Sequence, residues 1–484
     1  MLNRHFSIYL GAHIVPAIIG FFAITAYTRL LNPAEYGVYV VGMSVAGIFG
    51  AVFFTWIRLS VSRYQATSAD VDFRGTAIMA FVLTVLGISS IAPFTVLLFH
   101  PNFSVNVLAA GMFVAVAVGA FEIGQEFERA RLRPFRFAAI AVTRSVLGLG
   151  LGFLAIEMGW GGIGLIAAFG TSSLVGTIIN VAGGGARASR WQRSQLVQFA
   201  RYGLPLSIGG LTSALYSTSD RLIVAYLLGQ EATGLFGVAA DLPRQFMVML
   251  ASSVAAATFP IVFRTLSVEG AAATREKLNE NIELLFAVVA PVTVWLALAA
   301  DQVAGTLVGA EFRAGVSLLL PILAVARMLG VLNQFHLQIS FQLAERPFLS
   351  VMQSCLTLVL GVVSMVLLIP KFGLLGAALA TLITEAVGLV VAIHLTRRAF
   401  PLPFDMQRLA AVFASALTMG CAIYVAKLGV GGTGLLSLFS VSLAGGLAYA
   451  VAAWLFDVAR VRTLIMQMLR SRGLIYGGLA SRGG

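Results

Sequence analysis

The 484-residue chain is poor in charged residues, cysteine and histidine. Asp, Glu, Lys and Arg make up only 11% of the sequence, whereas soluble globular proteins carry about 25%. The two cysteines and five histidines show no spacing typical of a disulfide framework or a metal site. A Walker-type phosphate loop is absent, so ATP is not expected to be the energy source. These deficits exclude a soluble fold and an ATPase, and we expect no cofactor and no bound metal.

Hydrophobic residues account for 59% of the chain, and 50 further residues are glycine. A membrane-spanning helix needs about 20 consecutive apolar residues. We find fourteen such runs, separated by short turns that cannot hold a separate domain. The first run has no small-residue cleavage site after it, so it is expected to remain as a span. The sequence therefore predicts an all-α polytopic membrane protein with about 14 transmembrane helices.

The basic residues predict the orientation of these helices. If the N-terminus is cytoplasmic, 24 of the 32 Lys and Arg residues fall in inside segments, 4 fall in outside segments and 4 fall within spans. Cytoplasmic loops of membrane proteins carry such an excess. Both termini are therefore expected to be cytoplasmic, and the net charge of +12 is mostly a topology signal and not a sign of nucleic-acid binding.

The chain also repeats itself at a separation near 200 residues. Leu30-Leu31, Gly37 and Tyr39 recur as Leu227-Leu228, Gly234 and Phe236, an offset of 197. The segment RPF at 133–135 recurs at 346–348, an offset of 213, and Gly161, Gly164 and Gly176 recur as Gly373, Gly376 and Gly388, an offset of 212. Six spans separate equivalent positions, so both copies enter the membrane in the same direction.

The repeat predicts two pseudo-symmetric six-helix lobes followed by two extra helices. Their expected bounds are 1–197 for the N-lobe, 198–398 for the C-lobe, and 399–484 for the last two helices and a basic cytoplasmic tail. Transporters built from parallel repeats bind their substrate between the repeats. Gly161, Gly162 and Gly373 fall at the outside turns of equivalent hairpins, where glycine permits a tight reversal.

Ionisable residues within spans are costly and are candidates for function. Asp220 and Arg221 precede the turn between the seventh and eighth spans, and Asp241 and Arg244 follow it by a similar distance. In an antiparallel hairpin these four residues reach the same depth. Two interpretations stay open: the arginines bind an anionic headgroup while the aspartates carry a coupling cation or proton, or the four form a neutral network that only holds the helices in register.

Other polar residues within the spans extend this candidate site. Tyr216 and Ser217 belong to a polar stripe that leads to Asp220. Arg144 and Arg327 are candidates for binding phosphate, since a buried guanidinium without a partner needs an anion. For Arg144 the alternatives are pairing with Glu122 or extending to the interface. Glu385 is a candidate coupling residue; like His336, it is a lone polar residue whose other interpretation is structural.

Residues 28–39, TRLLNPAEYGVY, form a turn that resembles the one after the first helix of polysaccharide-transport (Wzx-type) flippases. Residues 58–64, 220–236 and 370–389 fit the same family pattern, so the similarity extends over most of the chain. These flippases belong to the multidrug/oligosaccharidyl-lipid/polysaccharide flippase superfamily. The resemblance implies a central basic cavity and alternating access for an undecaprenyl-pyrophosphate-linked oligosaccharide in the bacterial inner membrane, with Arg144, Arg221, Arg244 and Arg327 able to serve as cavity arginines.

The resemblance implies translocation of repeat units for O-antigen, capsule or exopolysaccharide, next to a polymerase and glycosyltransferases of the same pathway. A peptidoglycan lipid-precursor flippase and a cation-coupled multidrug antiporter are alternatives within the superfamily. The four arginines within spans argue against an acidic cavity for cationic drugs. A membrane polymerase or ligase is an alternative of another class, but it needs a large outside loop with catalytic residues. We therefore expect a transporter of lipid-linked oligosaccharide and not an enzyme.

Overall fold

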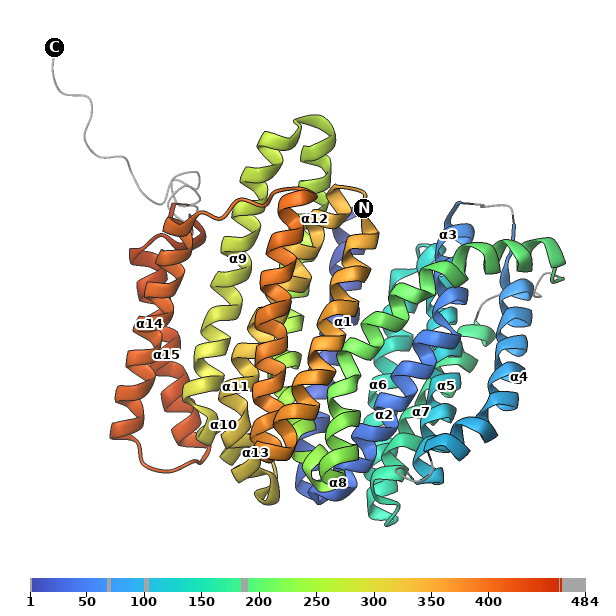
Figure 1. Cartoon of the computed structure of the whole chain (residues 1–484), viewed down its shortest axis with the longest axis horizontal. Helices are drawn as coiled ribbons and strands as arrows, with labels where there is room; N and C mark the ends of the chain where they lie inside the picture. The colour runs from blue at the N-terminus through green and yellow to red at the C-terminus, as the bar shows by residue number, and fades with distance from the viewer. Residues whose placement is uncertain (1, 68–70, 100–103, 184–189, 461, 464–484) are drawn as a thin grey trace. The chain divides into compact units, whose positions relative to one another are not determined.

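The computed structural model describes residues 2–67, 71–99, 104–183, 190–460 and 462–463. All regular elements in these segments are helical (Figure 1). In the first part of the chain they are α1 (Leu2–Leu30), α2 (Pro33–Phe53), α3 (Thr55–Thr67), α4 (Arg74–Phe99), α5 (Val105–Ala130), α6 (Pro134–Glu157), α7 (Gly161–Ala182) and α8 (Arg193–Val268). They continue as α9 (Ala271–Leu298), α10 (Ala300–Leu307), η1 (Ala310–Phe312), α11 (Arg313–Leu332), η2 (Asn333–Leu337), α12 (Gln338–Leu343), α13 (Pro347–Arg398), α14 (Met406–Gly429), α15 (Leu435–Leu455) and η3 (Val458–Arg460).

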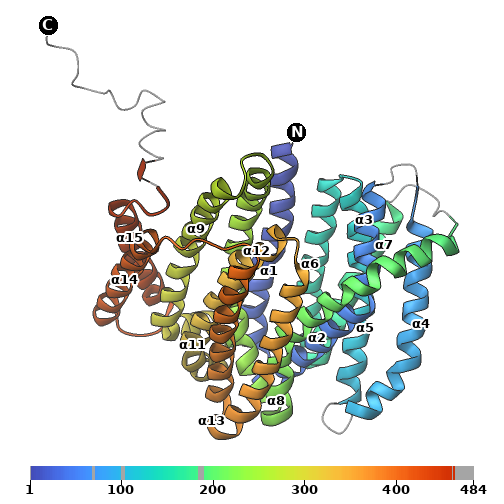
Figure 2. The same ribbon diagram turned by 45° about the horizontal axis from the view of Figure 1, so that its top comes forward.

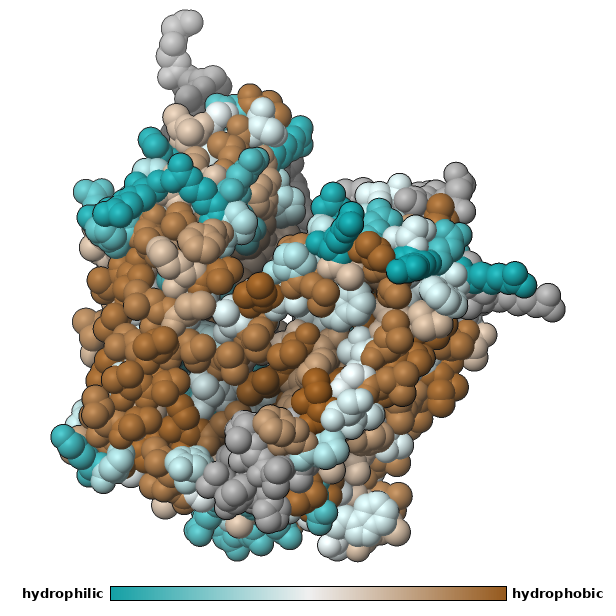
Figure 3. All heavy atoms as spheres, turned by 45° about the vertical axis from the view of Figure 1, so that its right-hand side comes forward, coloured by the Kyte–Doolittle hydropathy of each residue, from teal (hydrophilic) through white to brown (hydrophobic). Residues whose placement is uncertain are grey.

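The number of spans agrees with the expectation from the sequence. Eleven helical segments in the described part of the chain are long and apolar enough to cross a membrane. Two of them, α8 and α13, each consist of two helices that meet at a glycine with positive φ, Gly229 (85°) and Gly373 (57°). Counting these arms separately and adding α1 gives fourteen, which confirms the all-α polytopic fold. On the face in Figure 3, hydrophobic residues fill the middle and hydrophilic residues gather at the ends.

Local conformations at equivalent turns support the internal repeat. Gly161 and Gly373, 212 residues apart, have φ of 53° and 57°. Leu132 and Glu345, 213 residues apart, both have φ of 53°, a conformation uncommon outside glycine. The residues that follow donate matching hydrogen bonds, from the Arg133 N–H to the Glu128 carbonyl (3.1 Å) and from the Arg346 N–H to the Phe341 carbonyl (2.9 Å). Duplicated sequence has thus kept duplicated turn geometry.

The chain divides into two compact units. Unit 1 contains residues 1–245, 307–319 and 351–384, and unit 2 contains residues 246–306, 320–350 and 385–484. In unit 1, α5 and α6 pack on α7, α2 packs on α5, and α1 packs on α6. In unit 2, α14 packs on α15 and on α9, as both ribbon views show (Figures 1 and 2). The division into lobes at residues 197 and 398 stays a prediction.

Within unit 1 the two copies of the first repeated motif touch through their glycines. A Cβ atom at Gly37 would overlap the Gln230 carbonyl, and a Cβ atom at Gly234 would overlap the Pro33 carbonyl. Each glycine lies 197 residues from its counterpart, and so does each carbonyl. The contact is therefore reciprocal, as expected where two equivalent helix ends cross about a local two-fold axis.

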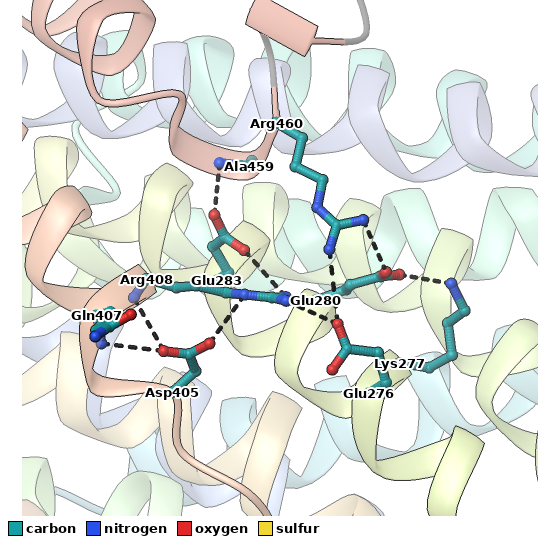
Figure 4. A network of polar contacts seen from close by, with 9 residues as sticks. All are labelled: Glu276, Lys277, Glu280, Glu283, Asp405, Gln407, Arg408, Ala459 and Arg460. Atoms are coloured by element: carbon teal, nitrogen blue, oxygen red, sulfur yellow. Dashed lines mark hydrogen bonds and ion pairs between the residues drawn. The ribbon is translucent and has the colours of Figure 1, made fainter.

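The two helices that follow the repeat are attached to α9 by an ion-pair network in unit 2 (Figure 4). Arg408, near the start of α14, lies 2.7 Å from Glu276 and 3.1 Å from Asp405. Arg460 in η3 lies 3.7 Å from Glu276 and 3.8 Å from Glu280. Farther along the helices, Trp295 donates to the Ser442 hydroxyl (2.9 Å) and Tyr449 donates to the Ala287 carbonyl (2.6 Å). These contacts join α14 and α15 to α9 along most of its length.

Candidate functional site

An ion pair joins the two arms of α8 within the span region. The chain reverses at Gly229, whose positive φ suits glycine, and this reversal brings Arg221 and Asp241 together. The Nη2 atom of Arg221 lies 2.6 Å from Oδ1 of Asp241, and Nε of Arg244 lies 3.4 Å from the same oxygen. The Arg221 side chain is only 8% exposed, whereas that of Arg244 is 48% exposed. One carboxylate therefore holds a buried arginine and an accessible one.

Asp220 takes no part in these ion pairs. Its carboxylate accepts the backbone N–H of Arg221 at 2.8 Å, and within the described residues no Lys or Arg side chain forms an ion pair with it. Three of the four charges therefore form one cluster and the fourth stands beside it. Tyr216 is half-buried on the preceding turn, and Ser217 is exposed and accepts a bond from Arg221 through its carbonyl at 3.4 Å.

Arg144, on α6, lies in an aromatic cage. Its guanidinium carbon is 4.6 Å from the ring centroids of both Phe121 and Phe169, on α5 and α7. Its Nε–H donates to the Ser173 hydroxyl at 3.0 Å. Among the described carboxylates none forms an ion pair with it. The cage thus holds the guanidinium through one hydrogen bond and two ring contacts, and none of these contacts neutralises its charge.

Glu122 is not the ion-pair partner of Arg144. Its carboxylate lies 2.9 Å from Nη1 of Arg58, at the start of α3, and the two side chains are 44% and 37% exposed. The sequence explained Arg58 by topology alone, and the structure adds it to this polar region.

Tyr39 lies on α2, in unit 1, which also holds the two groups of arginines. Its ring packs against that of Tyr36 with a centroid distance of 5.6 Å. The sequence used Tyr39 only as a motif residue, although a tyrosine next to spans that carry arginines was a usable signal. Phe121, Phe169 and Ser173 were also missed, because nothing in their spacing distinguishes them from residues that pack the helices. Unit 1 therefore contains several polar side chains at or near its spans, and we refer to this set as the polar path: Arg58, Glu122, Arg144, Tyr39 and the Arg221 cluster.

Arg327 and Glu385 belong to unit 2, so they are not placed with this path. Arg327 lies on α11 and is partly buried. Glu385 is 5% exposed, and a Cβ atom at Gly330, one turn after Arg327, would lie 2.8 Å from its Oε1 atom. His336 is buried in the π-helical turn η2, with Nδ1 3.3 Å from the Asn281 amide. Among the described residues, no group of three or more His, Cys, Asp or Glu side chains is placed to hold a metal ion.

Comparison with known proteins places this fold. Two proteins of the archaeon Haloferax volcanii are similar along most of their length: the probable low-salt glycan biosynthesis flippase Agl15 (25% identity, 93% of this chain and 95% of the relative) and the probable flippase AglR (22% identity, 87% and 89%). Among solved structures, the lipid II flippase MurJ in an inward closed conformation aligns with a TM-score of 0.76 at 15% identity, covering 95% of this chain and 99% of that one. A transporter of the multidrug/oligosaccharidyl-lipid/polysaccharide flippase superfamily from Pyrococcus furiosus aligns with a TM-score of 0.55 at 16% identity, covering 85% of this chain and 96% of that one.

A family model gives the assignment. The model described as "Polysaccharide biosynthesis protein" matches residues 26–317, which is more than half of the chain. This match includes the turn at 28–39 and the polar path of unit 1. It confirms the resemblance to Wzx-type flippases of the multidrug/oligosaccharidyl-lipid/polysaccharide superfamily, and the chain belongs to the polysaccharide biosynthesis protein family.

Proposed function

We propose that this protein moves a lipid-linked oligosaccharide from one leaflet of the membrane to the other by alternating access. Family membership supports this function, and so do two relatives named as probable flippases, one of them for low-salt glycan biosynthesis. A pyrophosphate cannot cross hydrocarbon without a polar, positively charged path, whereas the lipid tail can stay in the bilayer. The polar path of unit 1 provides such a path, and the protein acts as a transporter and not as an enzyme.

The observation that carries this proposal is that Arg144 lies within a span without an ion-pair partner among the described residues. Its guanidinium contacts a hydroxyl and two phenyl rings, and no described carboxylate forms an ion pair with it. A phosphate oxygen can take the remaining N–H groups in the bidentate geometry that arginine favours. Arg58 and Arg244 are both partly exposed and belong to the same unit as Arg144, and they are proposed to contact the phosphate at other stages of transport.

Asp220, Asp241 and Glu385 are the proposed coupling residues. Asp241 is held by two arginines, whereas Asp220 forms no ion pair with any described side chain. A cation or proton that binds near Asp220 would change the charge beside Arg221 and so the affinity of the arginine cluster for phosphate. Arg327, Tyr216 and Ser217 are proposed to contact the substrate.

The proposal also covers the lipid carrier, the saccharide, the membrane and the partner enzymes. The carrier is undecaprenyl pyrophosphate, and the saccharide is a repeat unit for O-antigen, capsule or exopolysaccharide. The protein lies in the bacterial inner membrane with both termini cytoplasmic, as the distribution of the 32 basic residues favours. A polymerase and glycosyltransferases act before and after it on the same lipid-linked substrate.

A deletion strain tests the proposal directly. Deletion should abolish the surface polysaccharide and cause its lipid-linked precursor to accumulate. Wild-type protein should reverse both effects, whereas Arg144→Ala should insert normally and reverse neither. Arg264→Gln is the matched control, because Arg264 is an exposed arginine outside the polar path. Normal polysaccharide in the Arg144→Ala strain would contradict the role of Arg144.

A peptidoglycan-precursor flippase is the second candidate. The alignment with MurJ, at a TM-score of 0.76 and 99% of that chain, favours it as far as the fold goes. The two candidates differ in the precursor that a deletion strain accumulates. A peptidoglycan precursor would identify the second function, and a longer oligosaccharide would identify the first.

A further inference from the structure

A surface pocket of about 420 Å³ lies in unit 1 where α3 ends and α8 begins. It is lined by Tyr64 from α3 and by Ser194, Val197, Gln198, Arg201 and Tyr202 from α8. The five residues from α8 follow one another at helical spacing, so they form one face of its first turns. The ribbon views show these first turns crossing the ends of α3 and α4 (Figures 1 and 2).

The walls of this pocket are held in place by the residues behind them. The Tyr64 ring stacks on Phe199 with a centroid distance of 5.8 Å, and Phe199 stacks on Phe73 at 5.7 Å. The Ser60 hydroxyl donates to the Phe199 carbonyl at 3.0 Å. A Cβ atom at Gly203 would overlap the Trp56 carbonyl, so the backbones of α8 and α3 are in direct contact. The pocket therefore exists without a ligand to shape it.

The chemistry of the lining suits a phosphorylated sugar. The rings of Tyr64 and Tyr202 meet edge to face at 5.6 Å, and both side chains are half-buried at the wall of the pocket. The guanidinium of Arg63 lies 4.5 Å from the Tyr202 centroid. Arg201 and Gln198 are exposed and offer donors to phosphate and hydroxyl oxygens. No carboxylate lines the pocket to oppose an anion.

The position of the pocket connects it with the polar path. Arg58 and Arg63 lie on the same short helix, α3, and Arg58 joins this helix to the polar path through its ion pair with Glu122. The end of unit 1 that holds the pocket also carries the arginine-rich turns expected to be cytoplasmic. A substrate made in the cytoplasmic leaflet would meet this pocket before it meets Arg144.

We propose that the pocket between Tyr64 and Arg201 is a docking site for the phosphorylated saccharide headgroup of the lipid-linked substrate before transport. This inference rests on the proposed function. It assigns Arg201 to the phosphate, Gln198 and Ser194 to sugar hydroxyls, and the two tyrosines to the apolar face of a sugar ring. A docking site of this kind raises the local concentration of substrate without taking part in its movement across the membrane.

Equilibrium binding to the full-length protein in phosphatidylcholine nanodiscs tests the site. The probe is a disaccharide joined to farnesyl pyrophosphate, a short-chain form of the substrate class. Arg201→Gln and Tyr202→Ala should each weaken binding by about tenfold, the loss expected for one charge-assisted contact. Arg193→Gln, an exposed arginine of the same helix outside the pocket lining, should bind as wild type. Unchanged size-exclusion profiles of the variants would show that folding is intact.

Two further arms separate the alternatives. Phosphatidylglycerol added to the nanodiscs should not displace the probe, and equal displacement would overturn the saccharide assignment in favour of an anionic lipid. In proteoliposomes, Arg201→Gln should raise the substrate concentration for half-maximal flipping and leave the maximal rate unchanged, whereas Arg144→Gln should lower the maximal rate. Wild-type binding by both pocket variants would overturn the docking site alone. A wild-type protein that binds the probe but never flips it would contradict the proposed function and leave the binding result to stand.

Discussion

The Asp241→Asn substitution should destabilise the protein because it leaves Arg221 buried without a counter-charge. The Arg221 side chain is 8% exposed and its Nη2 lies 2.6 Å from Asp241; among the described residues its one other side-chain hydrogen bond, to the Ser217 carbonyl, is 3.4 Å long. Breaking a buried ion pair by removing one partner costs about 3–5 kcal/mol. Since the Asp241 side chain is 20% exposed, we expect a loss near the lower end, about 3 kcal/mol.

Denaturant-induced unfolding of the purified protein in detergent measures this loss. The double variant Arg221→Gln/Asp241→Asn removes both charges and should recover most of the stability, since no buried arginine is left without its ion-pair partner. Arg244→Gln is the matched control and should cost about 1 kcal/mol or less, because that side chain is 48% exposed. A single Asp241→Asn variant as stable as wild type would refute the reasoning.

The same double variant separates the two interpretations of the cluster. If the charges serve transport, the refolded double variant should be stable and unable to export polysaccharide. If the charges only hold the arms of α8 in register, it should be stable and active. The proposal predicts the first result.

Two more predictions concern packing and attachment. Gly37→Val and Gly234→Val should reduce thermal stability to a similar degree, because each new side chain would overlap a carbonyl of the other motif copy. Gly446→Ala is the control and should be neutral, since Gly446 has open space around it. Unequal losses of stability in the two valine variants would contradict the reciprocal contact. Arg408→Gln should increase protease cleavage of the segment between α13 and α14, because Arg408 forms ion pairs with both Glu276 and Asp405. Lys427→Gln is the control and should change cleavage little, because the ion pair of Lys427 with Asp301 is more exposed.

Much of the fold could be predicted from the sequence because its signals are local. Apolar length determined the fourteen spans, and glycine at 161 and 373 marked reversals that the backbone makes with positive φ. The meeting of Arg221 and Asp241 also followed from local geometry, since equal distances from a turn place residues at equal depth.

The side-chain partners within the spans could not be predicted in the same way. Arg58 competes with Arg144 for Glu122, and only the packing of α3, α5 and α6 decides that competition. The aromatic cage brings together Phe121, Arg144 and Phe169 from three different helices, and the spacing of residues within a single helix cannot reveal such a contact. Asp220, adjacent to Arg221 in sequence, points its carboxylate to the backbone because successive helix positions face different directions.

Flipping by the purified protein tests the central claim most directly. Proteoliposomes would contain the farnesyl-pyrophosphate-linked disaccharide in both leaflets, and a membrane-impermeant glycosidase would report the fraction that reaches the outer leaflet with time. Wild-type protein should bring all of the substrate within reach of the enzyme, Arg144→Lys should do so more slowly, and Arg144→Gln should leave about half of it protected, as in protein-free vesicles. Flipping by Arg144→Gln at the wild-type rate would contradict the claim that the caged guanidinium binds the phosphate during transport.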